Sequence, residues 1–447
     1  MDVYTRNRSR VASAPLRGAS FASDAAGVVR FAHGSDQENN GKLYYRDNDK
    51  AEWRLLNDQA QSGHGEWPLG LSADGASAYL QVENEKGPDS IMVMDLASGK
   101  RREKLRDPLV DPYSVILDRG DWTPIGAFFM SDRMRTRFFE PESATARLYG
   151  MLEKAFPGQL VHVTSSTTDG RLLVVGTWSD TSPGDYYLYD TQSGQADLIF
   201  SRRNWFDPAK MSPMRAIQVK ARDGLQLHGY LSVPNGKKEQ NLPMVVLPHG
   251  GPYGIFDQWD FDDEVQMLNR AGYAVLRINF RGSGNYGKAF IEAGAREWGL
   301  KMQDDITDAT RWAIAQKIAD PSRICIYGAS YGGYAALMGV SKEPDLYRCA
   351  VGYVGVYDLT MMHKAESRQG VSMRNWTADW LGERADQAAV SPTNAAARIK
   401  VPVFLAAGGE DDTAPIAHSK RMAKALKAAG VPVETLYYQD EGHGFYT

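Results

Sequence analysis

Short apolar runs alternate with amphipathic stretches in the second half of the chain. Two stretches, 264–271 and 304–315, carry apolar residues at helical spacing. The runs that have the length of strands lie at 243–248, 273–278, 324–327, 401–407 and 434–438. Because strands that alternate with helices form parallel sheets, this pattern predicts an α/β domain over residues 208–447.

The preceding part of the chain shows short strands separated by turns. A turn at Ser72–Gly75 is followed by two strands and a closing turn at Ser98–Gly99, and Thr167–Gly170 with Ser193–Gly194 repeats this order at a matching interval. One four-stranded propeller blade takes about 40–50 residues, so the spacing fits two blades. We therefore predict an all-β, partial β-propeller domain of about four blades over residues 1–207. Chance similarity between β-hairpins is the alternative.

Residues 328–334, Gly-Ala-Ser-Tyr-Gly-Gly-Tyr, match the nucleophile elbow of an α/β-hydrolase. The run 324–327 before them predicts a strand, and 335–338 after them predict the start of a helix. At such a turn the serine adopts a strained conformation, and its neighbours must be small because helix and strand pass closely. We therefore predict that Ser330 is a nucleophile.

A serine nucleophile needs a base and a carboxylate, which in α/β-hydrolases follow it in the order acid, then histidine. Asp411 and Asp412 come at the carboxyl end of a predicted strand, where open α/β sheets place their sites. His443 lies between two glycines after the last predicted strand, which suits a tight loop that presents an imidazole. His418 is the rival base, but it falls in a helical stretch and is expected on the surface of that helix.

Acyl transfer also needs an oxyanion hole. One donor is expected to be the backbone N–H of Tyr331, the residue after the nucleophile. The second is expected from the Gly-rich loop 249–254, which follows the strand predicted at 243–248. Glycines there let the backbone approach a tetrahedral intermediate without an intervening side chain.

Several motifs together resemble the prolyl oligopeptidase family of serine peptidases, and within it the acylaminoacyl-peptidase and dipeptidyl-aminopeptidase-like branch. They are 249–252 (His-Gly-Gly-Pro), 279–283 (Asn-Phe-Arg-Gly-Ser), 328–334, 411–412 (Asp-Asp) and 442–445 (Gly-His-Gly-Phe). The resemblance covers about residues 210–447 and is much weaker before them. It implies an α/β-hydrolase catalytic domain preceded by a β-propeller that restricts entry to short peptides.

Carried over position by position, the resemblance makes Ser330 the nucleophile, His443 the base and Asp411 the acid. The acid is placed at Asp411 because the family's aspartate stands four residues before the proline that is Pro415 here. Asp412 is the next candidate.

The resemblance assigns the oxyanion donors to the N–H groups of Tyr331 and Gly251. This sequence departs from the family at Thr413, where many relatives carry an arginine or asparagine that helps to hold a backbone carbonyl of the substrate. A charge-assisted hydrogen bond is about twice as strong as a neutral one, so the hydroxyl of Thr413 offers a weaker anchor.

Tyr353, Val354 and Tyr357 follow a predicted strand and are candidates for lining the pocket of the residue before the scissile bond. Ordinary core packing is the alternative for all three. Arg281 and the pair Asp304–Asp305 are expected to form structural or solvated ion pairs rather than to bind substrate.

Composition limits the classes of partner and cofactor. The chain has 447 residues, 43% of them hydrophobic, and a net charge of −4, which gives no support for binding to nucleic acid or a membrane surface. No apolar run is long enough for a transmembrane helix, and residues 1–20 lack the apolar segment of a secretory signal. No His, Cys or carboxylate cluster has metal-ligand spacing, so no metal or cofactor is expected.

The chain contains two cysteines, which exclude a disulfide framework. Cys325 precedes the elbow and Cys349 lies in the next apolar stretch, so both are expected to be buried, unlinked side chains. A bond across neighbouring strands is the less favoured alternative.

The sequence thus predicts a serine peptidase that hydrolyses short peptides through an acyl-enzyme. A carboxylesterase or other acyl hydrolase would carry the same triad, and a non-catalytic propeller interaction protein is the alternative from another class. The predicted propeller favours the peptidase because it filters polymers by size.

The all-β part is short for a family propeller, and only four residues follow His443, so a fragment shortened at both ends is expected. Open sheet edges and an uncovered face of the last strands are then expected to favour self-association, including homo-oligomers. The compartment, cytoplasmic or periplasmic, stays open.

Overall fold

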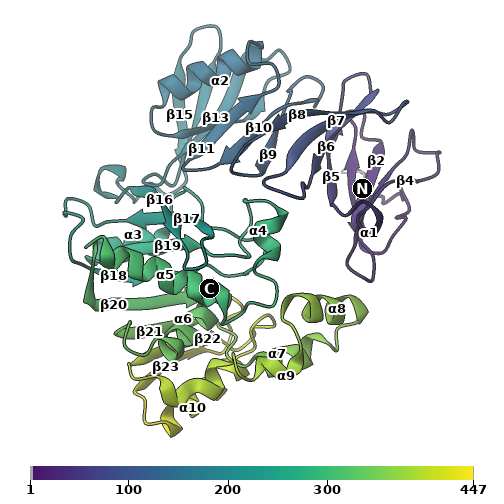
Figure 1. Cartoon of the computed structure of the whole chain (residues 1–447). Coiled ribbons are helices and arrows are strands. Elements are labelled where there is room, and N and C mark those ends of the chain that lie inside the picture. Colours follow the sequence, from purple (N-terminus) through teal and green to yellow (C-terminus); the bar gives the residue numbers. More distant parts are fainter. Residues whose placement is uncertain (1–3, 446–447) are drawn as a thin grey trace. The chain divides into compact units, whose positions relative to one another are not determined.

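The computed structural model describes residues 4–445, which build five β-sheets (Figure 1). These residues fall into two units. One unit comprises the chain up to Ala155 together with Ser165–Leu173 and Tyr286–Ala289. The other comprises Phe156–Thr164, Val174–Asn285 and the chain from Phe290 onward.

In four of the sheets the strands follow sequence order, as in propeller blades. The first sheet contains β1 (Ser20–Ser23), β2 (Val29–Ser35), β3 (Gly41–Tyr45) and β4 (Arg54–Asp58). The second contains β5 (Glu66–Leu71), β6 (Ser77–Val82), β7 (Ser90–Asp95) and β8 (Arg101–Arg106). The third contains β9 (Pro112–Leu117), β10 (Pro124–Met130) and β11 (Met134–Phe138), and the fourth contains β12 (Leu160–Ser166), β13 (Leu172–Trp178), β14 (Asp185–Asp190) and β15 (Ala196–Ser201). The predicted partial propeller is confirmed; two helices, α1 (Gln59–Ser62) and α2 (Ala144–Ala155), accompany these sheets.

The first turns of the second and fourth sheets have the same geometry. In one, the hydroxyl of Ser72 donates to Asp74 over 2.6 Å, and in the other the hydroxyl of Thr167 donates to Asp169 over 2.6 Å. The glycine after each aspartate takes a left-handed φ, +68° in one turn and +70° in the other. The repeat predicted from the sequence is therefore also a structural repeat.

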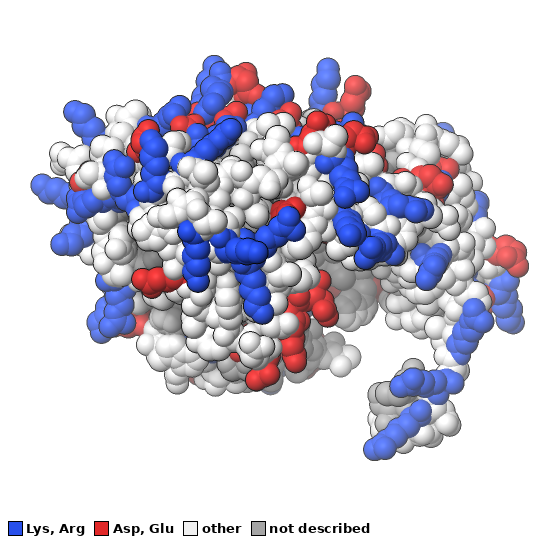
Figure 2. Space-filling view, turned by 90° about the horizontal axis from the view of Figure 1, so that it is seen from below, with Lys and Arg blue, Asp and Glu red and all other residues white. Residues whose placement is uncertain are grey.

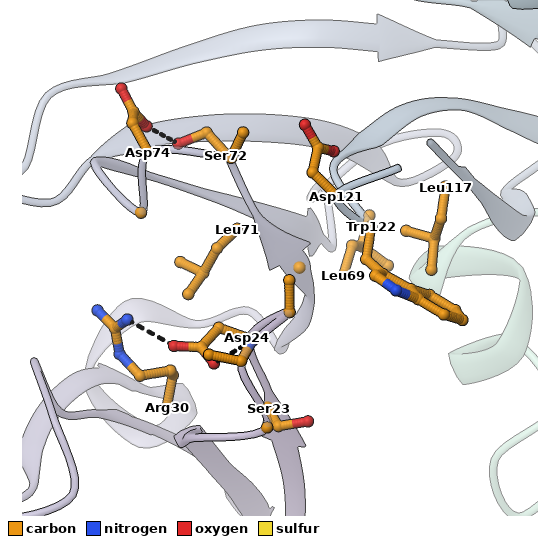
Figure 3. A pocket seen from close by; sticks show the side chains of 16 residues that line it. Ser23, Asp24, Arg30, Leu69, Leu71, Ser72, Asp74, Leu117, Asp121 and Trp122 are labelled. Carbon is orange, nitrogen blue, oxygen red and sulfur yellow. Dashed lines mark hydrogen bonds and ion pairs between the residues drawn. The ribbon is translucent and has the colours of Figure 1, made fainter. Parts of the chain in front are cut away.

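A cavity of about 650 Å³ opens among the turns of the first three sheets (Figure 3). Asp74, Asp121 and the indole of Trp122 line it, together with Asp24, which pairs with Arg30 at 3.0 Å. Asp74 and Asp121 accept hydrogen bonds from neighbouring residues of their own turns. These carboxylates therefore stabilise the turns.

The fifth sheet has eight strands in the order β16-β17-β19-β18-β20-β21-β22-β23, and it runs from teal to yellow in Figure 1. The pairs β16–β17 and β17–β19 are antiparallel, and the other neighbours are parallel. Its strands are β16 (Met214–Lys220), β17 (Gln226–Ser232), β18 (Leu242–Val246), β19 (Ala274–Asn279), β20 (Ala319–Ala329), β21 (Cys349–Tyr353), β22 (Val403–Gly408) and β23 (Val433–Tyr438). The predicted α/β-hydrolase domain is confirmed.

Helices cover this sheet. α5 (Lys301–Ala315) packs against α6 (Tyr331–Lys342), and α6 lies on β20 and β21. α10 (Ala417–Ala428) contacts β22 and β23, and α3 (Asp263–Arg270) contacts β19. The shorter helical segments are η1 (Pro208–Lys210), α4 (Lys288–Glu292), α7 (Leu359–Glu366), α8 (Val371–Trp380), α9 (Arg384–Gln387) and η2 (Pro392–Arg398).

The face of the sheet that carries α3 is only partly covered. Tyr327 packs there against a cluster formed by Leu247, Val265 and Val275. The strand register places Leu436 on the same face, where 39% of its surface is exposed.

The expectation of two unlinked cysteines is wrong. Cys325 on β20 and Cys349 on β21 are paired directly in the parallel register, and their sulfurs form a disulfide. Their Cα atoms are 4.8 Å apart, within the usual range for a bridge. Sequence spacing could not show this because the pairing depends on which strands become neighbours.

Basic and acidic side chains are interspersed on the face shown in Figure 2. This mixture agrees with the small net charge of −4. Within residues 4–445, no helix has the length and apolar character needed to cross a lipid bilayer.

Candidate active site

Ser330 lies at the sharp turn between β20 and α6, with φ +57° and ψ −120°. This conformation is rare for any residue other than glycine. A Cβ on Gly332 would lie 2.1 Å from the carbonyl oxygen of Pro248, and a Cβ on Gly328 would lie 2.5 Å from the carbonyl carbon of Gly332. Gly328 is therefore required by the close passage of β20 and α6, and Gly332 by the close passage of α6 beside the segment that follows β18.

Asp411 and His443 are brought together from the loops after β22 and β23. Nδ1 of His443 lies 2.8 Å from Oδ2 and 3.0 Å from Oδ1 of Asp411. Oδ1 of Asp411 also accepts the backbone N–H groups of Thr413 and Ala414, over 2.9 and 2.7 Å. The side chain of Asp411 is fully buried, whereas Asp412 is exposed. Of these two neighbouring aspartates, Asp411 is therefore the one that is hydrogen-bonded to His443.

Ser330 and His443 line the same cavity, of about 460 Å³. The other residues that line it are Gly250, Asp263, Glu264, Ala329, Tyr353, Val354, Gly444 and Phe445. A Cβ on Gly250 would lie 3.5 Å from Cβ of Ser330, so the Gly-rich loop passes directly beside the serine.

The two residues expected to supply oxyanion donors lie at this turn and in this loop. Tyr331 is the first residue of α6, and its side chain is buried against Phe280 and Trp298. Gly251 takes φ +111°, and a Cβ there would lie 2.9 Å from Cγ1 of Ile255. A glycine is therefore needed at this position both for the backbone conformation and for the close approach.

Tyr353, at the end of β21, contacts the segments that carry both Ser330 and His443. Its carbonyl accepts the N–H of Ser330 over 2.9 Å, and its hydroxyl accepts the N–H of Phe445 over 2.6 Å. Val354 follows with φ +43°, a strained conformation for a β-branched residue, and its N–H donates to the carbonyl of Ala406 over 2.8 Å.

The three candidates for the substrate pocket are thus placed differently. Tyr353 and Val354 line the cavity, whereas Tyr357 is fully buried and does not line it. The contact of the Tyr353 hydroxyl with Phe445 was missed from the sequence. Phe445 stands in the same motif as His443, 442–445, but that motif does not show which residue its backbone would contact.

His249, which begins the Gly-rich loop, also lacked a predicted role. Its ring stacks on Phe280 with 4.4 Å between centroids. Nδ1 lies 2.7 Å from the carbonyl oxygen of Gly250, which can only accept, so this nitrogen carries the proton. Nε2 lies 2.9 Å from the hydroxyl oxygen of Ser283. Burial lowers the pKa of His249 and keeps the ring neutral. The ring thereby holds the loop beside Ser330.

The expectation that His418 lies on a helix surface is wrong, because only 3% of this residue is exposed. Its Nδ1 accepts the N–H groups of Tyr357 and Asp358, over 3.2 and 3.3 Å. Burial lowers the pKa of His418 to about 4. The sequence pattern of α10 predicts a helix but does not show which segment packs against its first turn. His418 was therefore expected on the helix surface.

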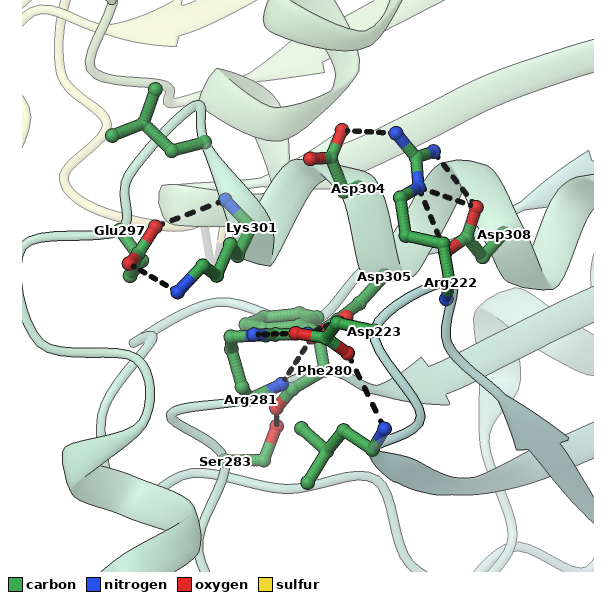
Figure 4. Close-up of polar contacts among 12 residues, drawn as sticks. Arg222, Asp223, Phe280, Arg281, Ser283, Glu297, Lys301, Asp304, Asp305 and Asp308 are labelled. Carbon is green, nitrogen blue, oxygen red and sulfur yellow. Dashed lines mark hydrogen bonds and ion pairs between the residues drawn. The ribbon is translucent and has the colours of Figure 1, made fainter.

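Arg281 forms a structural ion pair, as predicted (Figure 4). Its Nε donates to Asp305 over 2.8 Å and its Nη1 to Asp223 over 2.8 Å. The side chain of Arg281 is 5% exposed, and that of Asp305 is fully buried. The hydrogen bond from Arg281 lowers the pKa of Asp223 to about 2. Asp304 pairs separately with Arg222 at 3.1 Å.

Known proteins are similar to this chain in sequence. The model of the prolyl oligopeptidase family, Peptidase_S9, matches residues 259–447. Dipeptidyl aminopeptidase BIII of Pseudoxanthomonas mexicana is 30% identical over 467 aligned residues, which cover 100% of this chain and 66% of that protein. The chain belongs to the prolyl oligopeptidase family.

Other proteins match over shorter or more divergent regions. The acylamino-acid-releasing enzyme of Sus scrofa is 29% identical over 229 residues, 49% of this chain and 31% of that enzyme. A puromycin-hydrolyzing peptidase of Mycobacterium tuberculosis has the same fold, with a TM-score of 0.75 at 21% identity over 98% of this chain and 68% of its own. The chain therefore spans 66% or less of the length of these two curated relatives.

Proposed function

We propose that this chain is a serine peptidase that hydrolyses short peptides through an acyl-enzyme on Ser330, with His443 as base and Asp411 as acid. The observation that carries the proposal is the Asp411–His443 hydrogen bond of 2.8 Å, at the wall of the cavity that Ser330 also lines. Membership of the prolyl oligopeptidase family supports it. Two relatives are named dipeptidyl aminopeptidase and acylamino-acid-releasing enzyme, which fits a peptide substrate.

The proposed chemistry begins with the tautomer of His443. Because Nδ1–H donates to Asp411, the lone pair of the neutral ring lies on Nε2, which acts as the base. Oγ of Ser330 attacks the scissile carbonyl carbon while its proton passes to Nε2. The C–N bond then breaks, and the same proton passes to the leaving amine. A water molecule, deprotonated by His443, hydrolyses the resulting ester and restores Ser330.

The negative charge on the tetrahedral oxygen needs stabilisation. We assign this role to the N–H groups of Tyr331 and Gly251. Tyr331 begins α6, where the first N–H groups have no partner within the helix and the helix dipole is positive. Gly251 carries no side chain that would shield its N–H. Tyr353 and Val354 are the proposed wall for the substrate residue before the scissile bond.

Matched chromogenic substrates test this proposal. We assay the wild type and Ser330→Ala with three amides, which are made from a free dipeptide, an N-acyl amino acid and a peptide ending in proline. Each amide is matched by an ester that carries the same acyl group. Ser322→Ala, an exposed serine on the same strand, is the control. We expect amide hydrolysis that Ser330→Ala abolishes and Ser322→Ala leaves unchanged. Cleavage of the ester alone would indicate a carboxylesterase, and cleavage of neither would contradict the proposal.

A further inference from the structure

His418 on α10 is buried without being part of the proposed triad. Its Nδ1 accepts two backbone N–H groups, from Tyr357 at 3.2 Å and from Asp358 at 3.3 Å. A ring nitrogen that accepts carries no proton, so the neutral ring has its proton on Nε2. Its charged and titratable neighbours are Asp358, Arg421 and Asp411.

The segment that donates to His418 is the continuation of the wall of the active-site cavity. Tyr353, a few residues earlier, accepts the N–H of Ser330 through its carbonyl and the N–H of Phe445 through its hydroxyl. Val354 takes a strained φ of +43° in the same segment. A shift of residues 353–358 would therefore move contacts to both the serine and the loop of His443.

The helix that supplies His418 follows directly on the loop of the proposed acid. Asp411 fixes that loop by accepting the N–H groups of Thr413 and Ala414, and α10 begins at Ala417. One turn after His418, Nε of Arg421 forms an ion pair with Oδ2 of Asp358 at 3.1 Å. The first turn of α10 thus holds residues 353–358 at two points.

We propose that His418 is a positioning residue that fixes residues 353–358 relative to the Asp411 loop and so sets the fit of the substrate side chain beside Ser330. This inference rests on the proposed function for its kinetic consequence. A side chain without an acceptor at this position leaves two buried N–H groups unpaired, and buried unpaired donors drive local rearrangement. The displaced wall would affect substrates whose side chain fills the cavity more than substrates with a small side chain.

The test compares three variants of the full chain. His418→Leu removes the acceptor at similar volume, and His418→Asn restores an acceptor, because Oδ1 of asparagine takes about the place of Nδ1. Lys424→Leu, an exposed position on the same helix, is the control. Each protein is assayed for kcat and KM on two peptide amides that differ only in having alanine or phenylalanine before the scissile bond. Amide hydrogen exchange of residues 353–358 is measured in parallel.

For His418→Leu we compare kcat/KM for the phenylalanine substrate with kcat/KM for the alanine substrate. We expect the ratio of the first value to the second to fall at least tenfold. Exchange over residues 353–358 should also be at least tenfold faster. His418→Asn should recover both to within about threefold, and Lys424→Leu should match the wild type. If His418→Leu does not fold, His418→Gln, whose acceptor is displaced by one bond, replaces it in the same comparison.

An unchanged substrate ratio and unchanged exchange in a folded His418→Leu or His418→Gln protein would overturn the inference. A lower melting temperature with an unchanged ratio would also overturn it, because that is a purely structural role. A wild type that cleaves no amide would refute the proposed function instead. In that case exchange alone decides the inference, since it needs no activity.

Discussion

Two tight turns in this molecule are held in opposite ways. In the turn at Ser72–Gly75, the hydroxyl of Ser72 bonds to Asp74 over 2.6 Å, and a glycine takes the left-handed φ of +68°. In the turn at Ser330, a serine takes φ +57°, and the restraints come from distant segments. The N–H of Ser330 donates to Tyr353, and Gly332 passes against Pro248. The first turn is encoded by its own four residues, and the second by the packing of the whole sheet.

This difference shows which kind of turn can hold a strained backbone conformation. A locally encoded turn contains residues that favour its geometry, so it recurs wherever the motif recurs, as it does at Thr167–Gly170. A strained serine persists only because its surroundings over-determine it. We therefore expect changes at the Ser330 turn and its partners to cost far more than changes at the Ser72 turn.

The largest effect is expected at the acid. Asp411→Asn should leave the fold intact and lower kcat/KM by about 10⁴-fold, because an amide donor at this position favours the wrong tautomer of His443. The measurement is hydrolysis of a peptide amide, with circular dichroism to check the fold. Asp412→Asn, an exposed neighbour, should change the rate by less than about threefold, consistent with surface substitutions being nearly neutral. A severe loss of activity in Asp412→Asn with a mild loss in Asp411→Asn would show that Asp412, and not Asp411, is the acid.

Gly332→Ala tests the steric side of the comparison. Its Cβ would lie 2.1 Å from the carbonyl oxygen of Pro248, a backbone atom that cannot move independently. We expect hydrolysis to fall below detection and the free energy of unfolding to fall by about 3 kcal/mol, the upper end of the usual range for overpacked sites. Urea unfolding and amide hydrolysis measure the two effects. Wild-type activity in this variant would show that α6 does not pass so closely beside Pro248.

The pH dependence of stability tests whether packing against distant segments also lowers the pKa of His418. Burial lowers its pKa to about 4, against 6.5 for an exposed histidine. Between these values the unfolded chain binds more protons, so this contribution to stability is complete above about pH 6.5 and is lost as the pH falls towards 4. Its full size is about 3 kcal/mol. Urea unfolding at pH 7 and pH 4.5 should show a smaller loss for His418→Asn than for the wild type, and equal losses would contradict the assignment.

The smallest effect is expected at the locally encoded turn. A Cβ on Gly75 would meet only Nη1 of Arg30, at 3.9 Å, so Gly75→Ala should cost only the strain of a left-handed alanine, about 1–2 kcal/mol. Amide hydrolysis should stay within about threefold of the wild type. Thermal unfolding and the same peptide assay provide the measurements. A loss of activity like that of Gly332→Ala would remove the distinction between the two turns.

The same distinction explains what could be predicted from the sequence. The repeated Asp-Gly turns, the strand before Ser330 and the alternation of strands and helices follow from neighbouring residues, and all were predicted. The Cys325–Cys349 bond and the burial of His418 depend on which segments become neighbours in the sheet, and both predictions were wrong. Tyr353 was predicted to line a pocket, but its hydroxyl contact with Phe445 spans 92 positions and had no local signal.

The most direct test of the central claim is labelling of the folded chain with a fluorophosphonate probe, followed by peptide mapping. This probe reacts with a serine only when a neighbouring base and oxyanion donors activate it. We predict one labelled site, Ser330, with labelling lost in Ser330→Ala and His443→Ala and retained in Ser322→Ala. Folded protein that takes up no label, or takes it up at another serine, would contradict the account.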